Sequence, residues 1–475
     1  MFDPAEAPLA AAYTTARASR GRPFTIPGHK GSTDLVGEIV SGDVSMWPGL
    51  DTLHRSSGRL AAAQERAAQL WGAQWCRFSV GGSTHGNQAL ALAVAAPGDI
   101  VVATRAVHRS LLLGFVLAGL TPVWVEPAID PVSGLPVGIQ AASLAAALAD
   151  HPQARAVFVV EPGYVGTRSD VSALAALAHQ AGAPLIVDQA WGAHLGFHPG
   201  LPQHALAAGA DALVTSAHKA LPAYTQAALV MASTERLDRD RLDRAFDATH
   251  TTSPSGTILA SIDAARSVLA RDGHALLGRT IALVAQARAR LREVPGLLVL
   301  DGPADALDPT KLVVGLAGTG ADGMAVEDDL AAAGFPVEMA DRDTIVAVVT
   351  MADTGGADGT VQPFTQTLAR SVERHRGEPR LVRPAEWLGN GLPEVAASPR
   401  DAFFAPHETV DARSAVGRVC AELVAPYPPG IPALVPGEVV GAAVLDALRD
   451  AAASGVVVAY AADPSMSTVQ VVARS

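Results

Sequence analysis

The sequence predicts an α/β fold with a mostly parallel sheet, followed by a smaller α+β region towards the carboxy terminus. Between about Gln64 and Val214, apolar runs of strand length alternate with alanine- and leucine-rich stretches of helical length. A long helical region follows Gly256. After Gly296, short strand-like runs surround a single helix, so we place a boundary there. Residues 376–400, rich in Pro, Arg, Gly and Glu, indicate a connecting segment.

The individual elements follow from apolar runs and turn residues. The strands expected in the first part are Arg77–Val80, Asp99–Ala103, Pro122–Val125, Ala156–Val160, Leu185–Val187 and Ala212–Thr215. The stretch from Gly200 to Asp211 is expected to form a short helix between the last two, because it ends near a glycine. The helical region after Gly256 includes Ile258–Leu269 and Arg279–Val294. The elements expected afterwards are the strands Leu297–Leu300, Lys311–Val314, Pro336–Met339 and Thr344–Val349 and the helices Val326–Ala333 and Val439–Ala452.

Length and composition bound the class of protein. A chain of 475 residues exceeds one ordinary core. The net charge of −12 argues against non-specific nucleic-acid binding and is compatible with a cationic substrate. The two cysteines, Cys76 and Cys420, indicate neither a disulfide framework nor a thiolate zinc site. Residues 1–20 lack a secretion pattern, and Leu111–Leu120 is shorter than the roughly 18 residues of a membrane span. We therefore expect a cytoplasmic protein without a membrane partner.

Asp188 and Lys219 are the most informative candidates for chemistry. Each ends an expected strand, and Lys219 follows Asp188 by 31 positions, which suits one βαβ crossover. Ligands of open α/β sheets bind at the carboxyl ends of the strands. A lysine amine can form a Schiff base with an aldehyde cofactor, and an aspartate can keep a pyridine nitrogen protonated. The pair predicts pyridoxal phosphate. Taken alone, Lys219 is more typical of a surface lysine after a strand, and Asp188 of a helix cap.

A glycine-rich segment and a histidine could complete such a site. Gly81–Asn87 follows one strand and precedes the expected helix Gln88–Ala96, and its glycines, amides and hydroxyls suit a phosphate. The alternative is an ordinary helix start capped by Ser83. His108 could lie flat against a cofactor ring, or it could simply cap a helix.

Trp191, His194 and His198 could each have a role at a ligand site or a purely structural role. Trp191, after Ala190, could give a ring a close neighbour and an edge donor, although core packing is commoner for tryptophan. His194 and His198 have the spacing of a helical metal site, but Gly196 lies between them and no Glu is inside the pair. We interpret both histidines as structural and predict no metal site.

Several ordered motifs together resemble the fold-type I pyridoxal phosphate decarboxylases of ornithine, lysine and arginine. The motifs are Phe24–Gly31, Gly82–Asn87, Val107–Ser110, the segments around Asp188 and Lys219, Pro426–Pro432 and Pro436–Glu438. Many relatives have Asp-Glu-Ala-His where this chain has Asp188-Gln189-Ala190-Trp191, a variant similar to that of the large inducible bacterial enzymes. The amino-terminal wing domain of those enzymes is not found, so a decamer built through wings is not expected.

The resemblance implies a division of the chain and a role for each site residue. The implied segments are an amino-terminal arm (1–50), a large pyridoxal phosphate-binding domain (51–295), a small α+β domain (296–375), and a linker with a carboxy-terminal decarboxylase domain (376–475). By the resemblance, Lys219 would form the Schiff base, Asp188 would bind the pyridine nitrogen, and His108 and Ala190 would contact the two faces of the ring, with Trp191 near the cofactor's 3-oxygen. The residues implied in phosphate binding are Ser83, Thr84, Ser216 and His218. Thr251 or Thr252 would contact the phosphate of the neighbouring subunit, and Glu438 would bind the distal cation of the substrate.

The function implied is decarboxylation of a basic L-amino acid in a homodimer with shared active sites. Arginine or lysine is favoured over ornithine, and the product is a polyamine-type amine. Lys219 or His218 would return the proton to Cα. Glu438 could instead be an acid at the amino terminus of the last helix. The alternatives for the whole protein are another fold-type I enzyme, such as an aminotransferase, aldolase or carbon–sulfur lyase, and a non-catalytic binding protein.

Overall fold

The structure, a computed structural model, describes residues 3–18, 24, 26–30, 32–34, 36–46, 50, 58–303, 305–355, 360–382, 391–427, 430–453 and 456–474. Thr25 and Gly31 of the motif Phe24–Gly31, and Pro428 and Pro429 of the motif Pro426–Pro432, lie outside these ranges. The same holds for residues 383–390 of the predicted linker.

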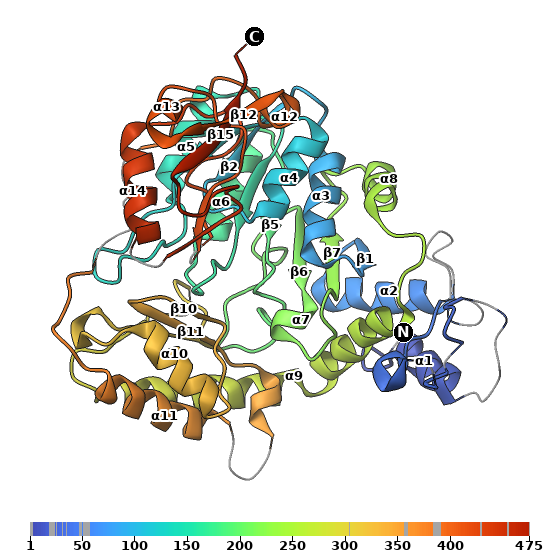
Figure 1. Cartoon of the computed structure of the whole chain (residues 1–475). Helices are drawn as coiled ribbons and strands as arrows, with labels where there is room; N and C mark the ends of the chain where they lie inside the picture. Colours follow the sequence, from blue (N-terminus) through green and yellow to red (C-terminus); the bar gives the residue numbers. More distant parts are fainter. Residues whose placement is uncertain are drawn as a thin grey trace.

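A seven-stranded sheet forms the centre of the molecule (Figure 1). Its spatial order is β1-β7-β6-β5-β4-β2-β3, with parallel pairing from β6 to β3, while β7 runs antiparallel to both of its neighbours. The strands are β1 (Trp75–Ser79), β2 (Ile100–Thr104), β3 (Thr121–Val125), β4 (Val157–Val160), β5 (Leu185–Asp188), β6 (Ala212–Ser216) and β7 (Ala228–Ala232). The predicted mostly parallel α/β fold is confirmed, although β7 was not predicted.

Helices cover both faces of this large sheet, because successive strand residues point to opposite sides. On β5, Val187 packs against one layer and Ile186 against the other. The first layer contains α2 (Arg59–Trp71), α5 (Ala141–Asp150), α6 (Val171–Gln180) and the first half of α9 (Gly256–Leu291). The second layer contains α3 (Gly82–Val94), α4 (Arg109–Ala118) and α8 (Arg239–Thr249). Apolar side chains thus cover the sheet on both faces, so a ligand can reach it only at the ends of its strands.

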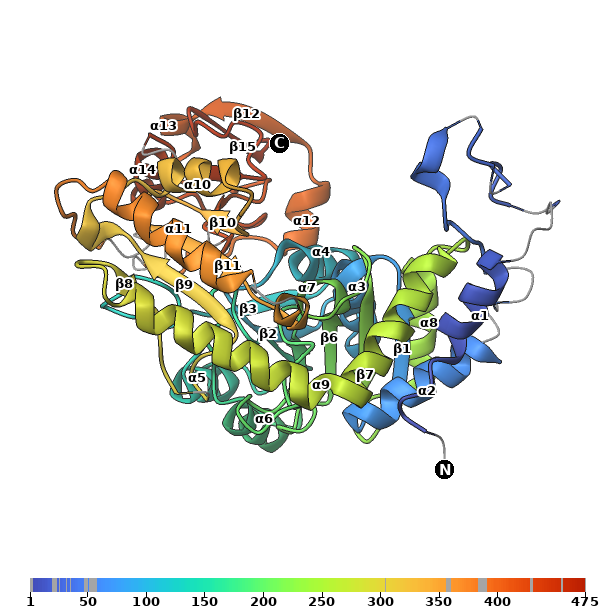
Figure 2. The same cartoon turned by 90° about the horizontal axis from the view of Figure 1, so that it is seen from below.

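A second sheet of four antiparallel strands lies beside the large one, in the order β10-β11-β9-β8. Its strands are β8 (Leu298–Val299), β9 (Lys311–Gly315), β10 (Met339–Ala340) and β11 (Thr344–Val348). Its other elements are α10 (Gly323–Ala332), α11 (Val361–Arg374) and the 3-10 turns η2 (Ala317–Thr319) and η3 (Met351–Thr354). Figure 2 shows α9 running from this sheet to α1 (Pro8–Ala18) and α2, so one helix spans both sheets.

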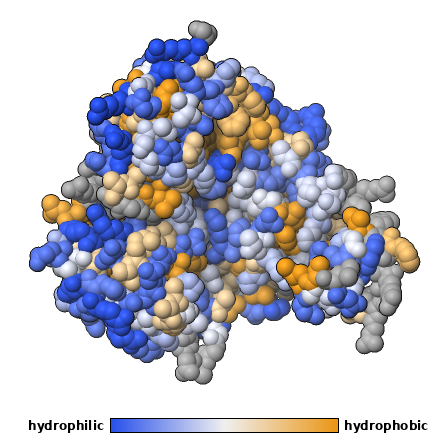
Figure 3. Space-filling model, viewed as in Figure 1, coloured by the Kyte–Doolittle hydropathy of each residue, from blue (hydrophilic) through white to orange (hydrophobic). Residues whose placement is uncertain are grey.

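The carboxy-terminal unit has its own buried core and sits against the second helix layer. Its elements are α12 (Pro399–Phe404), α13 (Ala412–Ala415), α14 (Ala442–Ala453) and the strand pairs β12 (His407–Asp411) with β15 (Thr468–Val472) and β13 (Ala425–Tyr427) with β14 (Val457–Ala459). Two short elements remain: η1 (Gly37–Val40) near the amino terminus, and α7 (Ala217–Ala220) directly after β6. Most of the face in Figure 3 is hydrophilic, with hydrophobic residues in small groups.

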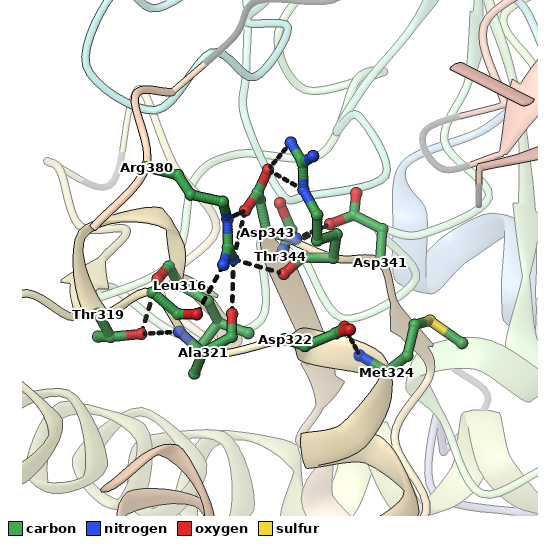
Figure 4. Close-up of polar contacts among 11 residues, drawn as sticks. Leu316, Thr319, Ala321, Asp322, Met324, Asp341, Asp343, Thr344 and Arg380 are labelled. Atoms are coloured by element: carbon green, nitrogen blue, oxygen red, sulfur yellow. Dashed lines mark hydrogen bonds and ion pairs between the residues drawn. The ribbon is translucent and has the colours of Figure 1, made fainter. Parts of the chain in front are cut away.

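Arg380 fixes the turn of the small sheet (Figure 4). Its Nε atom donates to Asp343 Oδ1 at 2.8 Å, and its Nη2 atom donates to the carbonyl of Ala321 at 2.6 Å. Asp341 Oδ1 accepts from the amides of Asp343 and Thr344, which closes the turn between β10 and β11. The hairpin that precedes the carboxy-terminal segment is therefore held at its turn by charge-assisted hydrogen bonds.

Two predicted elements need correction. Gly200 to Asp211 forms turns and no helix, because the hydrogen bonds around His204 do not continue beyond a single turn and a helix is costly to start. The long helical region predicted after Gly256 is confirmed as one helix, α9, which ends at Leu291. The predicted strand Pro336–Met339 pairs only from Met339 onward, since proline has no amide to donate to the ladder. The predicted boundaries at residues 50, 295 and 375 stay predictions.

Candidate active site

A cavity of about 450 Å³ opens at the carboxyl ends of β4, β5 and β6. The predicted site residues that line it are Ser83, Thr84, His108, Asp188, Ala190, Trp191, Ser216, His218 and Lys219. The register explains this grouping, because Asp188, the last residue of β5, pairs with Val214 of β6 and the chain reaches Lys219 just beyond. Side chains that are far apart in the sequence thus meet at one edge of the large sheet, as expected for an open α/β fold.

Asp188 forms the floor of the cavity. It is 3% exposed, and its Oδ1 atom accepts from the amide of Ala190 at 3.1 Å. Its Oδ2 atom accepts from Asn87 Nδ2 at 2.7 Å. A buried carboxylate held by two donors is fixed in place and can stabilise a cation in front of it.

Asn87 also connects Asp188 to His108. The second hydrogen of Asn87 Nδ2 goes to Ser110 Oγ at 2.9 Å, and Ser110 Oγ lies 2.7 Å from His108 Nδ1. Because Nδ1 accepts from the amide of Ser110, His108 caps α4 and its ring is held over the cavity. The cap interpretation and the ring-contact interpretation therefore describe the same side chain. Neither Asn87 nor Ser110 was predicted as a supporting residue.

The amino terminus of α3 lines another side of the cavity. The helix begins at Gly82, six residues earlier than predicted, so Ser83 and Thr84 lie in its first turn. Gly82 has φ +66°, a conformation that glycine adopts readily. Ser83 Oγ and Ser216 Oγ are 2.7 Å apart. The first-turn amides, together with these hydroxyls, form a cradle that suits a phosphate group.

Lys219 lies against Trp191, with its Nζ atom 4.0 Å from the centre of the indole ring. Partial burial lowers the pKa of Lys219, although the charges of Asp188 and Glu338 act in the opposite direction. Trp191 is itself held edge-to-face by Tyr164, with ring centres 5.3 Å apart. The amine is therefore easier to deprotonate than an exposed lysine, which a nucleophilic amine requires.

His218 also faces the cavity, but one ring nitrogen is already used. Its Nδ1 atom lies 2.9 Å from the carbonyl oxygen of Ala227, and because a carbonyl only accepts, Nδ1 carries the hydrogen. Burial lowers the pKa of His218, so the other nitrogen, Nε2, has no proton near neutral pH. Neutral His218 can accept a hydrogen bond in the cavity but has no second hydrogen to donate there.

Glu338 is a cavity residue that the sequence did not reveal. It directly precedes β10 and comes from the small sheet, whereas Asp188 comes from the large one. Tyr164 donates a hydrogen bond to Glu338 Oε1 at 3.3 Å, and Tyr427 lies beside Tyr164 with ring centres 5.9 Å apart. The only available signal was an acidic residue inside the apolar stretch predicted as Pro336–Met339.

Glu438 does not line the cavity, which calls for a correction. It is 1% exposed, and Arg105 binds both of its carboxylate oxygens, with Nη2 2.9 Å from Oε2. Its Oε2 atom also accepts from the amide of Val435 at 2.9 Å. With its acceptors occupied inside the protein, Glu438 joins the carboxy-terminal unit to the large sheet and has no free face for a substrate cation.

Thr251 and Thr252 are exposed and lie outside the cavity of their own chain. The ring of the preceding residue, His250, stacks on Phe246 with centres 5.0 Å apart, and its Nε2 atom lies 3.5 Å from the amide of Val80. The threonines therefore begin a short exposed segment that precedes α9. Their predicted contact with a neighbouring subunit stays a prediction.

His194 and His198 have different environments. His194 Nε2 lies 3.1 Å from a carboxylate oxygen of Asp308 and is buried, whereas His198 lies near the surface beside His274. Within the described ranges, no three His, Cys, Asp or Glu side chains are grouped so that they could hold a metal ion. None of the helices in those ranges combines the length and apolarity that crossing a lipid bilayer requires.

Family models and several similar proteins carry the description decarboxylase. A family model described as Orn/Lys/Arg decarboxylase, major domain, matches residues 7–301, and one described as Orn/Lys/Arg decarboxylase, C-terminal domain, matches residues 386–454. A relative named arginine decarboxylase, from Bacillus subtilis (strain 168), is 34% identical over 433 residues, which are 88% of this chain and 88% of that protein. Another of that name, from Halalkalibacterium halodurans, is 33% identical over 464 residues, 94% of each chain.

Solved structures support the fold independently. Lysine decarboxylase A from Pseudomonas aeruginosa superimposes with a TM-score of 0.81 at 22% identity, over 99% of this chain and 81% of that one. The lysine decarboxylase of Francisella novicida gives a TM-score of 0.79 at 18% identity, over 98% and 81%. These neighbours share the fold-type I architecture with a smaller carboxy-terminal region. By the family matches and the sequence identity over most of its length, the chain belongs to the Orn/Lys/Arg decarboxylase family.

Proposed function

We propose that this protein decarboxylates a basic L-amino acid with pyridoxal phosphate as cofactor. One observation carries the proposal: a single cavity contains an amine, Lys219, a buried carboxylate, Asp188, and a second carboxylate, Glu338, on the opposite sheet. The first two suit the cofactor, and the third suits a substrate with a positive charge at its far end. A neutral or acidic substrate would leave Glu338 without a counter-charge.

The residues of the cavity fit pyridoxal phosphate group by group. The first turn of α3 with Ser83 and Ser216 suits its phosphate, and buried Asp188 suits a protonated ring nitrogen. His108 and Ala190 would contact the two faces of the ring. When bound, the cofactor supplies an electron-accepting ring that stabilises the charge left as carbon dioxide departs.

The protein's own groups hold that arrangement and move the proton. Asp188, fixed by Asn87, would keep a proton on the ring nitrogen, and exclusion of water from the cavity would further favour loss of the carboxylate. Lys219 is the group that returns a proton to Cα, because neutral His218 has its one hydrogen engaged by Ala227. The sequence left these two residues open as proton donors, and the hydrogen bond of His218 favours Lys219.

Glu338 is the proposed ligand of the distal cation, in place of Glu438. An accessible carboxylate can pair with either an ammonium or a guanidinium. Tyr164 and Tyr427 stand beside it and would flank the aliphatic part of a substrate. Arginine is the first substrate to test, because the relatives that are 33–34% identical bear the name arginine decarboxylase.

The test is a product assay with arginine, lysine and ornithine. Release of carbon dioxide and the matching amine supports the proposal, whereas formation of a keto acid identifies an aminotransferase. The Lys219→Ala variant should lose turnover, and sustained turnover in it would refute the mechanism.

Substitution of Glu338 tests how the substrate is recognised. Glu338→Gln should raise the apparent KM at least tenfold with a smaller change in kcat, because the variant loses the charge-assisted contact with the distal cation of the substrate. Asp328→Asn, which removes an exposed charge from α10, is the matched control. An unchanged KM in Glu338→Gln would exclude this carboxylate from substrate binding.

We further propose a cytoplasmic homodimer in which Thr251 or Thr252 reaches the partner's cradle. Both threonines are exposed next to the cradle of their own chain, which supports this arrangement. Sedimentation of the holoprotein gives the mass of the assembly. Weakened cofactor binding in a Thr251→Ala/Thr252→Ala variant that still dimerises would place these side chains at a shared site.

A further inference from the structure

Lys311 is a buried cation with no polar partner. It opens β9, is 4% exposed, and its Nζ atom makes no hydrogen bond within the described residues. Burying an ammonium without a hydrogen-bond acceptor is costly. The side chain therefore needs a reason to be there other than stability.

The Nζ atom of Lys311 lies on the same indole as the proposed cofactor lysine. It is 3.6 Å from the ring centre of Trp191, and Lys219 Nζ is 4.0 Å from that centre. The two nitrogens can be no farther apart than these distances combined. A cation is attracted to an indole face, but two ammonium groups at such a separation repel each other.

Both sheets fix the direction of the Lys311 side chain. A Cβ atom on Gly166 would lie 2.6 Å from Lys311 Cγ, so the stem passes where only glycine leaves space. Arg288 of α9 donates from Nη2 to the carbonyl of Lys311 at 2.6 Å. The amide of Asp308 donates to the carbonyl of Gly166 at 2.8 Å, which ties the turn before β9 to the large sheet. The position of the ammonium is therefore built into the junction of the two sheets.

Other charged groups around the pair do not neutralise Lys311 by direct contact. Asp308 is engaged by His194 Nε2 at 3.1 Å and by Thr310 Oγ1 at 2.8 Å. The remaining titratable groups around the two lysines are Asp188 from β5, His108 before α4, His218 from α7, Glu338 before β10, Tyr164, Tyr427 and Arg288. Burial lowers the pKa of Lys311 to about 8, opposed by Asp308 and assisted by Lys219. Lys311 thus still carries a proton at neutral pH.

We propose that Lys311 is a positioning residue for Lys219: its unpartnered ammonium, held on the face of Trp191, makes the Lys219 amine give up its proton more readily, as attack on an aldehyde requires. The inference rests on the proposed function, because it gives Lys219 the task of binding the cofactor. A neighbouring cation is one of the recognised ways to activate a lysine nucleophile. Trp191 is then the surface that sets the spacing of the two charges.

The first experiment measures the titration of Lys219 in the cofactor-free full-length protein. Competitive acylation at a series of pH values, followed by mass spectrometry, gives the midpoint of Lys219 and of Lys311 separately. Lys311→Met should raise the midpoint of Lys219 by about one pH unit, the size expected for loss of a like charge at this range. Lys311→Arg, which keeps the charge, should stay close to the wild type.

A substitution that changes no charge serves as the control. Thr280 lines a second, small cavity together with Trp191 and Lys311. Thr280→Val alters this cavity without changing a charge, so the titration midpoint of Lys219 should not move. An equal rise in Thr280→Val, or no rise in a folded Lys311→Met protein, would overturn the proposal. If Lys311→Met fails to fold, the wild type decides: a Lys311 midpoint below about 6 would mean no charge at neutral pH and would also overturn it.

The second experiment measures pyridoxal phosphate affinity by absorbance. At pH 7 the apparent Kd of Lys311→Met should rise about tenfold, and the difference should shrink as the pH rises by one to two units. A purely structural role would weaken binding equally at every pH. If the wild type binds no pyridoxal phosphate at all, the proposed function fails, while the acylation result still decides the coupling of the two lysines.

Discussion

Arg105 and Lys311 are both buried cations near the cavity, yet their surroundings are opposite. Arg105 donates hydrogen bonds to Glu438 and to the carbonyls of Pro432 and Ala433. Lys311 has an indole face and no acceptor. A fully satisfied buried cation fixes one arrangement of the chain, whereas an unsatisfied one leaves its charge to act on a neighbour. The comparison separates a cation that holds two units together from one that adjusts a reactive group.

The largest effect is expected from breaking the satisfied pair. Arg105→Met leaves the Glu438 carboxylate buried without its partner and should lower the free energy of unfolding by about 3–5 kcal/mol. The double variant Arg105→Met/Glu438→Leu should recover much of that loss, because two apolar side chains leave no buried charge. Urea unfolding of the three proteins measures both changes. A loss of less than about 1 kcal/mol in the single variant would show that the Arg105–Glu438 pair does not hold the two units together.

Removal of the unsatisfied cation should act in the other direction. The pKa of Lys311 is lowered from 10.5 to about 8, so between these pH values the unfolded chain holds a proton that the folded protein has lost. Stability should therefore rise with pH across this window, and the full cost, of order 3 kcal/mol, is present below pH 8.

The Lys311→Met variant should lose this pH dependence. We expect it to be more stable than the wild type by about 1–3 kcal/mol at pH 7, with the difference gone near pH 10.5. Urea unfolding of the cofactor-free proteins at the two pH values measures it. A Lys311→Met protein that is less stable at pH 7 would show that Lys311 is needed for packing.

Asp188 is an intermediate case: its buried carboxylate accepts two hydrogen bonds, and the one from Asn87 can be removed by substitution. Asn87→Ala deletes the hydrogen bond to Asp188 Oδ2 and should weaken pyridoxal phosphate binding about ten- to a hundredfold, in line with about 1.5–3 kcal/mol for a hydrogen bond to a charged group. Equilibrium titration by absorbance provides the measurement. Unaltered affinity would mean that the amide of Ala190 alone suffices to hold Asp188.

The smallest effect is expected at Tyr164, whose hydroxyl donates to Glu338 over a long 3.3 Å contact. Tyr164→Phe keeps the ring on Trp191 and should raise the KM for the basic amino acid two- to fourfold. Steady-state kinetics measure this change. An increase as large as that of Glu338→Gln would show that the hydroxyl itself contacts the substrate.

Local sequence was sufficient for the cofactor side of the cavity. Asp188, Lys219 and His108 each follow an apolar strand, so their motifs alone indicate where they lie in an α/β sheet. The family resemblance then predicted roles for them, and the fold and the family are confirmed. The residue roles stay predictions that the shared cavity supports.

The other side depends on contacts that no local pattern contains. Glu338 and Lys311 are single charged residues at the starts of apolar strands, and only the packing of the small sheet brings them to the cavity. Glu438 was predicted as a substrate ligand from the family resemblance, and its actual partner, Arg105, lies 333 positions earlier. Long-range pairing of this kind follows from tertiary packing and cannot be read from periodicity.

Helix α9 gives this architecture a mechanical property. Its 36 residues make a rod of about 54 Å, with Asp263 binding the first amides of α1 near one end and Arg288 binding the Lys311 carbonyl near the other. Insertion of one residue between those two side chains would turn one end by about 100° relative to the other. The length of α9 thus fixes how the small sheet is placed relative to the large one, and with it the distance between Lys219 and Glu338 across the cavity.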